Sequence, residues 1–137
     1  MKVIMDHIVV NVEDDEKMMD FYTRLMGFSP ERFKAYREGK IPFPSVRLNE
    51  ETIIDLFPEN IWGKHYGRSD TARPNIHHFC LAVPAGKWKA IKDRLSAEGV
   101  PIEEGPVPRW GAHSYGTSIY FRDPENNLIE LRHYDWT

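Results

Sequence analysis

An internal repeat constrains the fold of this chain more than any other feature. The segment 6–12 reads DHIVVNV and the segment 77–83 reads HHFCLAV, so each has a histidine second and a valine seventh. Both segments are short, apolar and rich in β-branched or aromatic residues, which favours strands. Apolar residues at helical spacing follow each strand, and a glycine then ends each helix, Gly27 in the first half and Gly99 in the second. The repeat therefore predicts two similar supersecondary units.

Three further strand candidates follow each predicted helix, so we expect the order βαβββ twice. The candidates are 33–36, 45–48, 52–57, 102–103, 118–122 and 127–133. Asp14 or Asp15 can cap the first helix, and Trp88, Ile91 and Leu95 mark the apolar side of the second. The aromatic segment 59–75 is expected to be a loop that packs on the body or covers a pocket. The fold class is thus α+β, in one domain with module one at about 1–73 and module two at about 74–137.

Composition excludes several function classes. The chain has 137 residues, 41% of them hydrophobic and 28% charged, which is a globular balance. Its net charge of −3 and its scattered basic residues give no reason to expect a nucleic acid partner. No apolar run is long enough to span a membrane, and no signal peptide is recognised. With Cys80 as the one cysteine, these features predict a cytoplasmic protein without disulfides.

Strand alternation predicts where the polar side chains of the repeat gather. If Ile8, Val10 and Val12 pack against a helix, His7 faces the opposite side of its strand. By the same argument, His78 lies on the other face of its strand from Phe79, Leu81 and Val83. Glu130 lies on the other face from Ile129 and Leu131, and Asp55 lies on the other face from Ile54 and Leu56. Two modules related by a pseudo-twofold axis would bring these four side chains together.

Imidazole and carboxylate groups in this combination suit one divalent ion of zinc, iron, manganese, nickel or cobalt. A single histidine at a strand end is more often a surface or hydrogen-bonded residue than a ligand. Glu130, however, lies in an apolar strand, where an unpaired charge is costly and needs a partner. His77 is an alternative to His78, although the repeat alignment favours His78. Cys80 can be a nucleophile, but a buried structural thiol is the preferred interpretation.

Three motifs resemble the vicinal oxygen chelate superfamily: DHIVV at 6–10, FYTRLMGF at 21–28 and YFRDPENNLIEL at 120–131. That superfamily includes glyoxalase I, fosfomycin-resistance thiol transferases, extradiol dioxygenases and bleomycin-binding proteins. The resemblance covers nearly the whole chain. It implies paired βαβββ modules that form curled mixed sheets around a metal-binding cleft, and often a homodimer.

The resemblance also assigns roles to particular residues. His7, His78 and Glu130 match the metal ligands that the metalloenzymes of the superfamily share, and Asp55 falls where glyoxalase I has a fourth ligand, a glutamate. Tyr120 and Ser114 fall where fosfomycin enzymes have a pocket tyrosine and serine. Val9 and Trp110, however, replace the threonine and the lysine of those enzymes, which argues against fosfomycin chemistry.

The sequence therefore predicts a metal-dependent enzyme for a small oxygen-chelating substrate, glyoxalase-like (lyase or isomerase) or dioxygenase-like. In this hypothesis Glu130 or Asp55 moves a proton and Tyr120 orients the substrate. The alternative is a non-catalytic module that binds a small molecule or drug, with aromatic stacking surfaces from Trp62, Tyr66, Trp110 and Tyr115. A purely structural metal site is disfavoured because such sites are usually closed and rich in cysteine.

Overall fold

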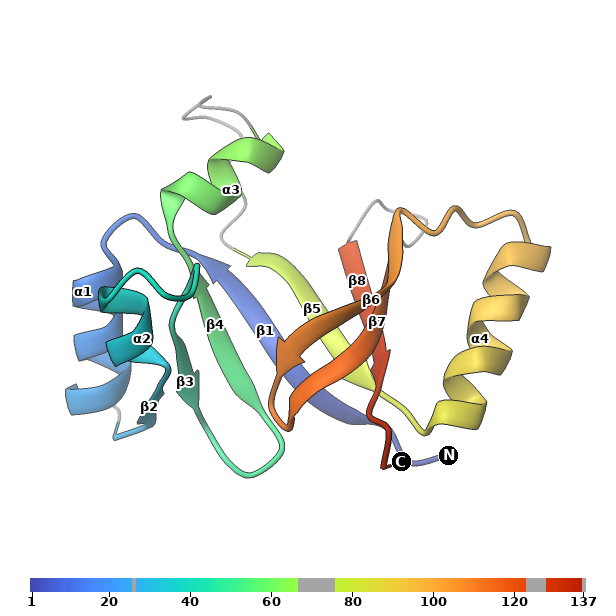
Figure 1. The fold of residues 1–137 in the computed structure, drawn as a ribbon, viewed down its shortest axis with the longest axis horizontal. Coiled ribbons are helices and arrows are strands. Elements are labelled where there is room, and N and C mark those ends of the chain that lie inside the picture. The colour runs from blue at the N-terminus through green and yellow to red at the C-terminus, as the bar shows by residue number, and fades with distance from the viewer. Residues whose placement is uncertain (26, 67–75, 123–127, 137) are drawn as a thin grey trace. The chain divides into compact units, whose positions relative to one another are not determined.

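A computed structural model describes residues 1–25, 27–66, 76–122 and 128–136 (Figure 1). The chain forms two compact units. The first unit, Ile8–His77, is called the N-terminal unit, and the second, Met1–His7 with His78–Thr137, is called the C-terminal unit. The C-terminal unit contains the predicted order βαβββ from β5 (Ile76–Ala82) to β8 (Leu128–His133), and the N-terminal unit has one additional helix between its second and third strands. Both units combine helices with a mixed or antiparallel sheet, which confirms the predicted α+β class. In the described part of the chain, no helix is both long and apolar enough to cross a membrane.

The N-terminal unit contains four strands in the hydrogen-bonded order β2-β3-β4-β1, and β1 begins in the C-terminal unit. Its elements are β1 (Ile4–Asn11), α1 (Asp15–Asp20), the π-helix η1 (Phe21–Leu25), β2 (Ser29–Glu31), α2 (Phe33–Arg37), β3 (Ser45–Arg47), β4 (Ile53–Phe57) and α3 (Glu59–Tyr66). The pairs β2–β3 and β3–β4 are antiparallel. The first helix begins as predicted, since the Asp14 carboxylate accepts a 3.0 Å hydrogen bond from the Lys17 N–H.

Helix α1 covers the strands of this unit through one apolar cluster. Val12, Met19, Val46 and Leu56 are buried together, and Val10 and Ile54 pack against them. Val10, Val12, Ile54 and Leu56 therefore lie on the helix side of their strands, as alternation predicts. Gly27 takes a left-handed φ of 79°, and its N–H donates to the Thr23 carbonyl at 3.0 Å. The first helical segment thus ends at the expected glycine.

Two segments of this unit are helical where the sequence predicted otherwise. Residues 33–36, a predicted strand, belong to helix α2, and the strand that pairs with β3 is instead β2. Tertiary contacts hold α2, since Tyr36 donates to the Asp15 carboxylate and Arg37 forms an ion pair with Glu16. The predicted loop 59–75 begins with helix α3, in which the Trp62 indole N–H donates to the Val12 carbonyl at 3.0 Å. Residues 67–75 of that segment lie outside the described residues.

The C-terminal unit contains strands in the order β1-β5-β8-β7-β6, with one helix between β5 and β6. Its elements are β5 (Ile76–Ala82), α4 (Ala85–Ala97), β6 (Glu104–Gly111), β7 (Ser114–Arg122) and β8 (Leu128–His133). The pair β5–β8 is parallel, while β8–β7 and β7–β6 are antiparallel. The predicted strand 102–103 is wrong, because β6 begins after it at Glu104. Strand β6 contains Pro106 and Pro108, which an edge strand tolerates and which weaken the strand signal in the sequence.

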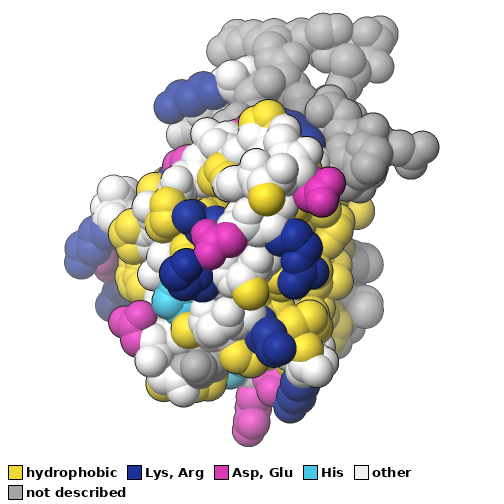
Figure 2. All heavy atoms as spheres, turned by 90° about the vertical axis from the view of Figure 1, so that its right-hand side faces the viewer, with side chains coloured by type: hydrophobic (Ala, Val, Ile, Leu, Met, Phe, Trp, Pro, Cys, Tyr) yellow, Lys and Arg dark blue, Asp and Glu magenta, His cyan; other side chains and the backbone are white. Residues whose placement is uncertain are grey.

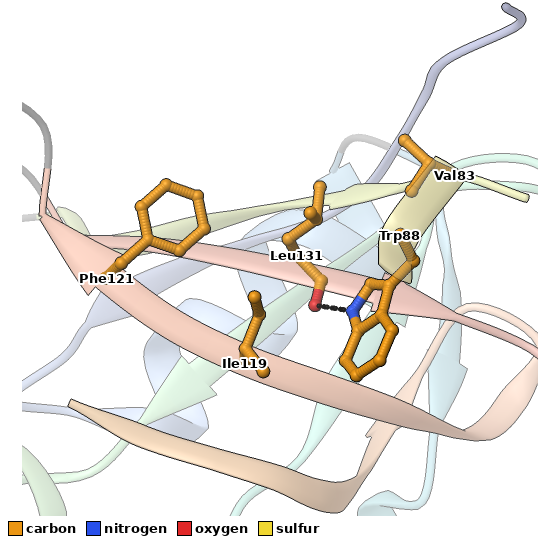
Figure 3. Close-up of a cluster of buried hydrophobic side chains, with 5 residues drawn as sticks. All are labelled: Val83, Trp88, Ile119, Phe121 and Leu131. Carbon is orange, nitrogen blue, oxygen red and sulfur yellow. Dashed lines mark hydrogen bonds between the residues drawn. The ribbon is translucent and has the colours of Figure 1, made fainter. Parts of the chain in front are cut away.

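Helix α4 packs on this sheet through a second apolar cluster (Figure 3). Val83, Trp88, Ile119, Phe121 and Leu131 are buried together. The Trp88 indole N–H donates to the Leu131 carbonyl at 2.9 Å and so ties the helix to β8. The opposite side of α4 is polar, and Figure 2 shows basic and acidic side chains interspersed over that face. One pair is Lys89 with Asp93 at 2.7 Å, as expected for a solvated helix face.

Candidate metal centre

Three of the predicted site residues meet inside the C-terminal unit. His7 lies in β1, His78 in β5 and Glu130 in β8, and all three side chains are buried. The Glu130 Oε2 atom is 2.8 Å from His7 Nε2 and 3.0 Å from His78 Nε2. The two Nε2 atoms are 3.4 Å apart. Two imidazole nitrogens and one carboxylate oxygen therefore converge on one point.

The pleat of the strands produces this convergence. Leu81, Ile129 and Leu131 pack into the cluster under α4. His78, Cys80 and Glu130 lie an odd number of residues from them along the same strands and therefore face the other side. The parallel pairing of β5 with β8 then sets Cys80 directly beside Glu130. Because one face of these strands is fixed in the core, a shift by one residue would bury the polar set under the helix.

The donor atoms fit one divalent ion of the first transition series or zinc. Such an ion holds its nitrogen and oxygen ligands at about 2.0–2.2 Å, which places neighbouring ligand atoms about 2.8–3.6 Å from each other. The three measured separations, 2.8, 3.0 and 3.4 Å, fall within that range. Two histidines and one carboxylate with further positions open is also a donor set that iron and similar ions adopt in enzymes.

The charges of the site favour a cation at this point. Burial opposes ionisation of Glu130, but His7, His78 and Arg132 outweigh it and hold the pKa of the Glu130 carboxyl well below its usual range. Burial also opposes a charged His7, yet Cys80, Glu130 and the hydrogen bond to Asp6 raise the pKa of His7 well above its usual value. Burial lowers the pKa of His78, which keeps that imidazole neutral. A divalent ion would supply the positive charge that the carboxylates of Glu130 and Asp6 attract.

Each end of this group has further partners that the sequence did not indicate. Asp6 Oδ1 accepts a 2.6 Å hydrogen bond from His7 Nδ1, which turns Nε2 of that ring toward Glu130. The Ser118 hydroxyl and Arg132 Nη2 both donate to Glu130 Oε1 at 2.7 Å, which leaves Oε2 for the histidines. Arg132 shares the alternating face of Glu130, and Ser118 pairs with Arg132 across β7 and β8. Strand alternation accounts for the shared face of Glu130 and Arg132, but not for their partners on other strands.

The remaining predicted residues lie elsewhere or have other contacts. Asp55 belongs to the N-terminal unit, is buried in β4 and accepts a 2.5 Å hydrogen bond from the Ser45 hydroxyl. Tyr120 pairs with Glu130 across β7 and β8, and its ring centroid is 5.6 Å from that of His78. Ser114 is exposed at the start of β7 with a left-handed φ of 75°. His77 is buried in the N-terminal unit, 5.2 Å from the Phe57 ring.

Cys80 and the aromatic residues have limited scope for direct chemistry. Cys80 is fully buried, and burial raises the pKa of its thiol to about 12, which fits the structural interpretation. Trp62 is also buried and its N–H is bonded to the backbone. Trp110 and Tyr115 form an edge-to-face pair at 6.0 Å, with Tyr115 exposed. The side chain of Tyr66 lies outside the described residues.

Comparisons with known proteins agree with this fold. The model of the glyoxalase/bleomycin resistance protein/dioxygenase superfamily matches residues 4–131. The chain is 35% identical to a glyoxalase domain-containing protein of Mycosarcoma maydis, over 95% of this chain and 68% of the relative. It is 32% identical to a virulence protein of Salmonella typhimurium, over 94% and 83%. The Mn(II)-bound glyoxalase of Novosphingobium aromaticivorans shares the fold, with a TM-score of 0.64 and 17% identity over 96% of this chain and 39% of that one. The chain therefore belongs to the glyoxalase/bleomycin resistance protein/dioxygenase superfamily.

Proposed function

We propose that this chain is a divalent-metal-dependent enzyme that acts on a small substrate with two neighbouring oxygen atoms. The observation that carries the proposal is the convergence of His7 Nε2, His78 Nε2 and Glu130 Oε2 within 3.4 Å of one another. Three protein donors leave coordination positions for substrate oxygens, as catalytic rather than structural sites do. The family match and the Mn(II)-bound glyoxalase of the same fold support this interpretation.

In this proposal each residue has a distinct task. His7, His78 and Glu130 hold the ion, which supplies Lewis acidity toward substrate oxygens when bound. Both oxygens of Glu130 already have partners, since Oε1 accepts from Ser118 and Arg132 and Oε2 faces the histidines. Glu130 is therefore assigned as a ligand, and its predicted role in proton transfer is not retained.

Tyr120 is assigned to orient the substrate. It pairs with Glu130 in the sheet and its ring lies against His78. Burial, followed by the charge of Glu130, raises the pKa of the Tyr120 phenol. The phenol is thus protonated at neutral pH and can donate a hydrogen bond to a substrate oxygen.

We place glyoxalase-like isomerase or lyase chemistry first and dioxygenase chemistry second. The two differ in their need for oxygen, because an isomerase moves a proton while a dioxygenase incorporates both atoms of O₂. Turnover without oxygen, with zinc, nickel, cobalt or manganese, supports the first. Consumption of O₂ with iron or manganese supports the second.

A non-catalytic binding module is the alternative, and the pair of Trp110 with exposed Tyr115 is the observation in its favour. A module of this kind would bind an aromatic ligand equally well with and without metal. Calorimetric titration of such ligands before and after treatment with a chelator distinguishes it from the enzyme.

Metal analysis of matched variants tests the proposal. The parent protein is expected to carry about one divalent ion per chain, and a chelator should lower its melting temperature. His7→Ala, His78→Ala and Glu130→Ala should each abolish stoichiometric metal. His77→Ala is the matched control, because it removes a buried histidine that directly precedes His78 in the sequence and should retain the ion. A parent that binds no divalent ion, or a metal lost with His77→Ala and kept with His78→Ala, would contradict the proposal.

A further inference from the structure

Asp6 is a buried carboxylate with partners on both of its oxygens. Oδ1 accepts from His7 Nδ1 at 2.6 Å and from the Ala112 N–H at 3.2 Å. Oδ2 accepts from the Tyr134 hydroxyl. Asp6 is therefore a hydrogen-bond acceptor on the outer side of one proposed metal ligand.

Arg132 is fully buried and contacts the outer side of another proposed ligand. Its Nη2 donates to Glu130 Oε1 at 2.7 Å and to the Trp110 carbonyl at 2.9 Å. Its Nη1 donates to the Tyr134 hydroxyl at 3.2 Å, and its Nε lies 3.8 Å from Asp6 Oδ1. The planar guanidinium holds these directions together, which an ammonium group cannot do.

These contacts close a ring. From His7 it passes to Asp6, then through Tyr134 or directly to Arg132, then to Glu130, and back to His7 across 2.8 Å. Tyr134 is also buried, and its hydroxyl donates to one member and accepts from the other. Every member belongs to the C-terminal unit.

We propose that Asp6 and Arg132 act as one positioning unit, which sets the orientation of His7 and Glu130 from the side away from the metal. This inference rests on the proposed function, because it assumes that His7 and Glu130 are ligands. Neither Asp6 nor Arg132 offers an atom to the metal in this assignment. Each would otherwise be a buried charge without adequate compensation, so neither can keep its position if the other is replaced. The proposal therefore requires that the two residues act on metal affinity together and not separately.

Cobalt titration of single and double variants tests this coupling. Asp6→Asn keeps an acceptor for His7 but removes the charge, and Arg132→Lys keeps the charge but removes the planar fork. Each is expected to weaken Co²⁺ binding by about 10- to 100-fold and to change the visible absorption of the bound ion. The double variant should bind about as weakly as the weaker single variant. If the two substitutions acted independently, the affinity loss of the double variant would equal the product of the two single losses, to within about twofold. That result would overturn the proposal.

Matched variants separate this role from a general loss of stability. Asp20→Asn and Arg122→Lys alter exposed ion pairs, with Arg24 and Glu103, and should leave Co²⁺ affinity unchanged. Tyr134→Phe removes only the hydroxyl that joins Asp6 to Arg132. It should weaken Co²⁺ binding in the same direction even if Arg132→Lys fails to fold. Parent-like affinity in a folded Tyr134→Phe and in Asp6→Asn would refute the ring.

A measurement on metal-free protein keeps the test distinct from that of the proposed function. The imidazole N–H proton of His7 that bonds to Asp6 should give a strongly downfield NMR resonance. Tyr134→Phe and Arg132→Lys should shift it, although neither residue is assigned a contact with His7. A resonance unchanged in both folded variants would overturn the positioning unit. A parent that binds no Co²⁺ but shows these shifts would overturn the proposed function and the assignment of ligands, and with them the inference.

Discussion

Gly111 offers a way to disturb the ring of Asp6, Tyr134, Arg132 and Glu130 without replacing any of its members. A Cβ added at this position would lie 2.5 Å from Asp6 Oδ1, 2.6 Å from Arg132 Cζ and closest of all to Arg132 Nη1. Ordinary contacts between such atoms are about 3.5 Å, so the nearest guanidinium nitrogen would have to move by about 1.5 Å. That movement would lengthen the 2.7 Å bond from Arg132 to Glu130 beyond hydrogen-bond range.

We therefore expect Gly111→Ala to lower the free energy of unfolding by about 1–3 kcal/mol, the usual range for overpacking in a buried site. Metal affinity should fall by about tenfold or more, as for other changes behind a ligand. Urea denaturation of the metal-free protein measures the first effect, and titration with Co²⁺ measures the second.

Gly63→Ala is the matched control. Its Cβ would meet nothing closer than Glu59 Cγ at 4.0 Å, and it lies in helix α3. Alanine should increase stability there by up to about 1 kcal/mol and leave metal affinity unaltered. If Gly111→Ala matched the parent in both assays, the close packing of Asp6 and Arg132 around this glycine would be refuted.

Three further predictions concern other parts of the chain. Cys80 should not react with a thiol reagent until the protein unfolds, since burial raises the pKa of the thiol to about 12; rapid modification of the native protein would contradict this. Burial and the hydrogen bond to Asp15 raise the pKa of Tyr36 to about 12, so this contribution to stability is present below about pH 10 and lost as the pH rises through about 12. Absorbance titration should show that Asp15→Asn lowers the pKa of Tyr36, and an unchanged value would refute the contact. Light scattering should give a homodimer of about twice the 16.1 kDa chain mass, and a stable species of single mass would contradict that expectation.

Much of the candidate metal centre could be predicted from one rule of strand geometry. Leu81 in β5 and both neighbours of Glu130 in β8 pack under α4, so the period of two already determines which face holds the polar set. His78 and Glu130 meet because β5 and β8 are adjacent and parallel, and His7 joins them because β1 is the next strand beside β5. The sequence repeat predicted that these strands lie together only on the assumption that a pseudo-twofold axis relates the two modules.

Elements that depend on long-range contacts were predicted less well. Residues 33–36 contain two aromatic residues and so resemble a strand, yet the contacts of Tyr36 and Arg37 with α1 hold them in a helix. The two prolines of β6 obscured the strand pattern in the sequence, because proline is tolerated in an edge strand but is rare in strands overall.

The contacts behind the ligands could not be predicted for a related reason. Asp6 accepts a hydrogen bond from Tyr134, and Arg132 donates to the Trp110 carbonyl and approaches Asp6, only once β1, β6 and β8 are assembled. Their separation in sequence exceeds 120 residues for the first pair, and no local pattern marks such a partner. Asp6 before the first histidine and Arg132 two residues after Glu130 are visible in the sequence, but the contacts that connect them are not.

The charges in this part of the C-terminal unit bear on the choice between enzyme and binding module. Asp6 and Glu130 carry two negative charges and Arg132 carries one positive charge, all buried. With a divalent ion and neutral imidazoles, the sum over these groups becomes plus one. A neutral ligand would leave that charge without compensation in a buried setting, which is costly. An anionic oxygen ligand balances it, so the electrostatics favour a substrate that develops negative charge on oxygen during the reaction, as the proposed isomerase chemistry requires.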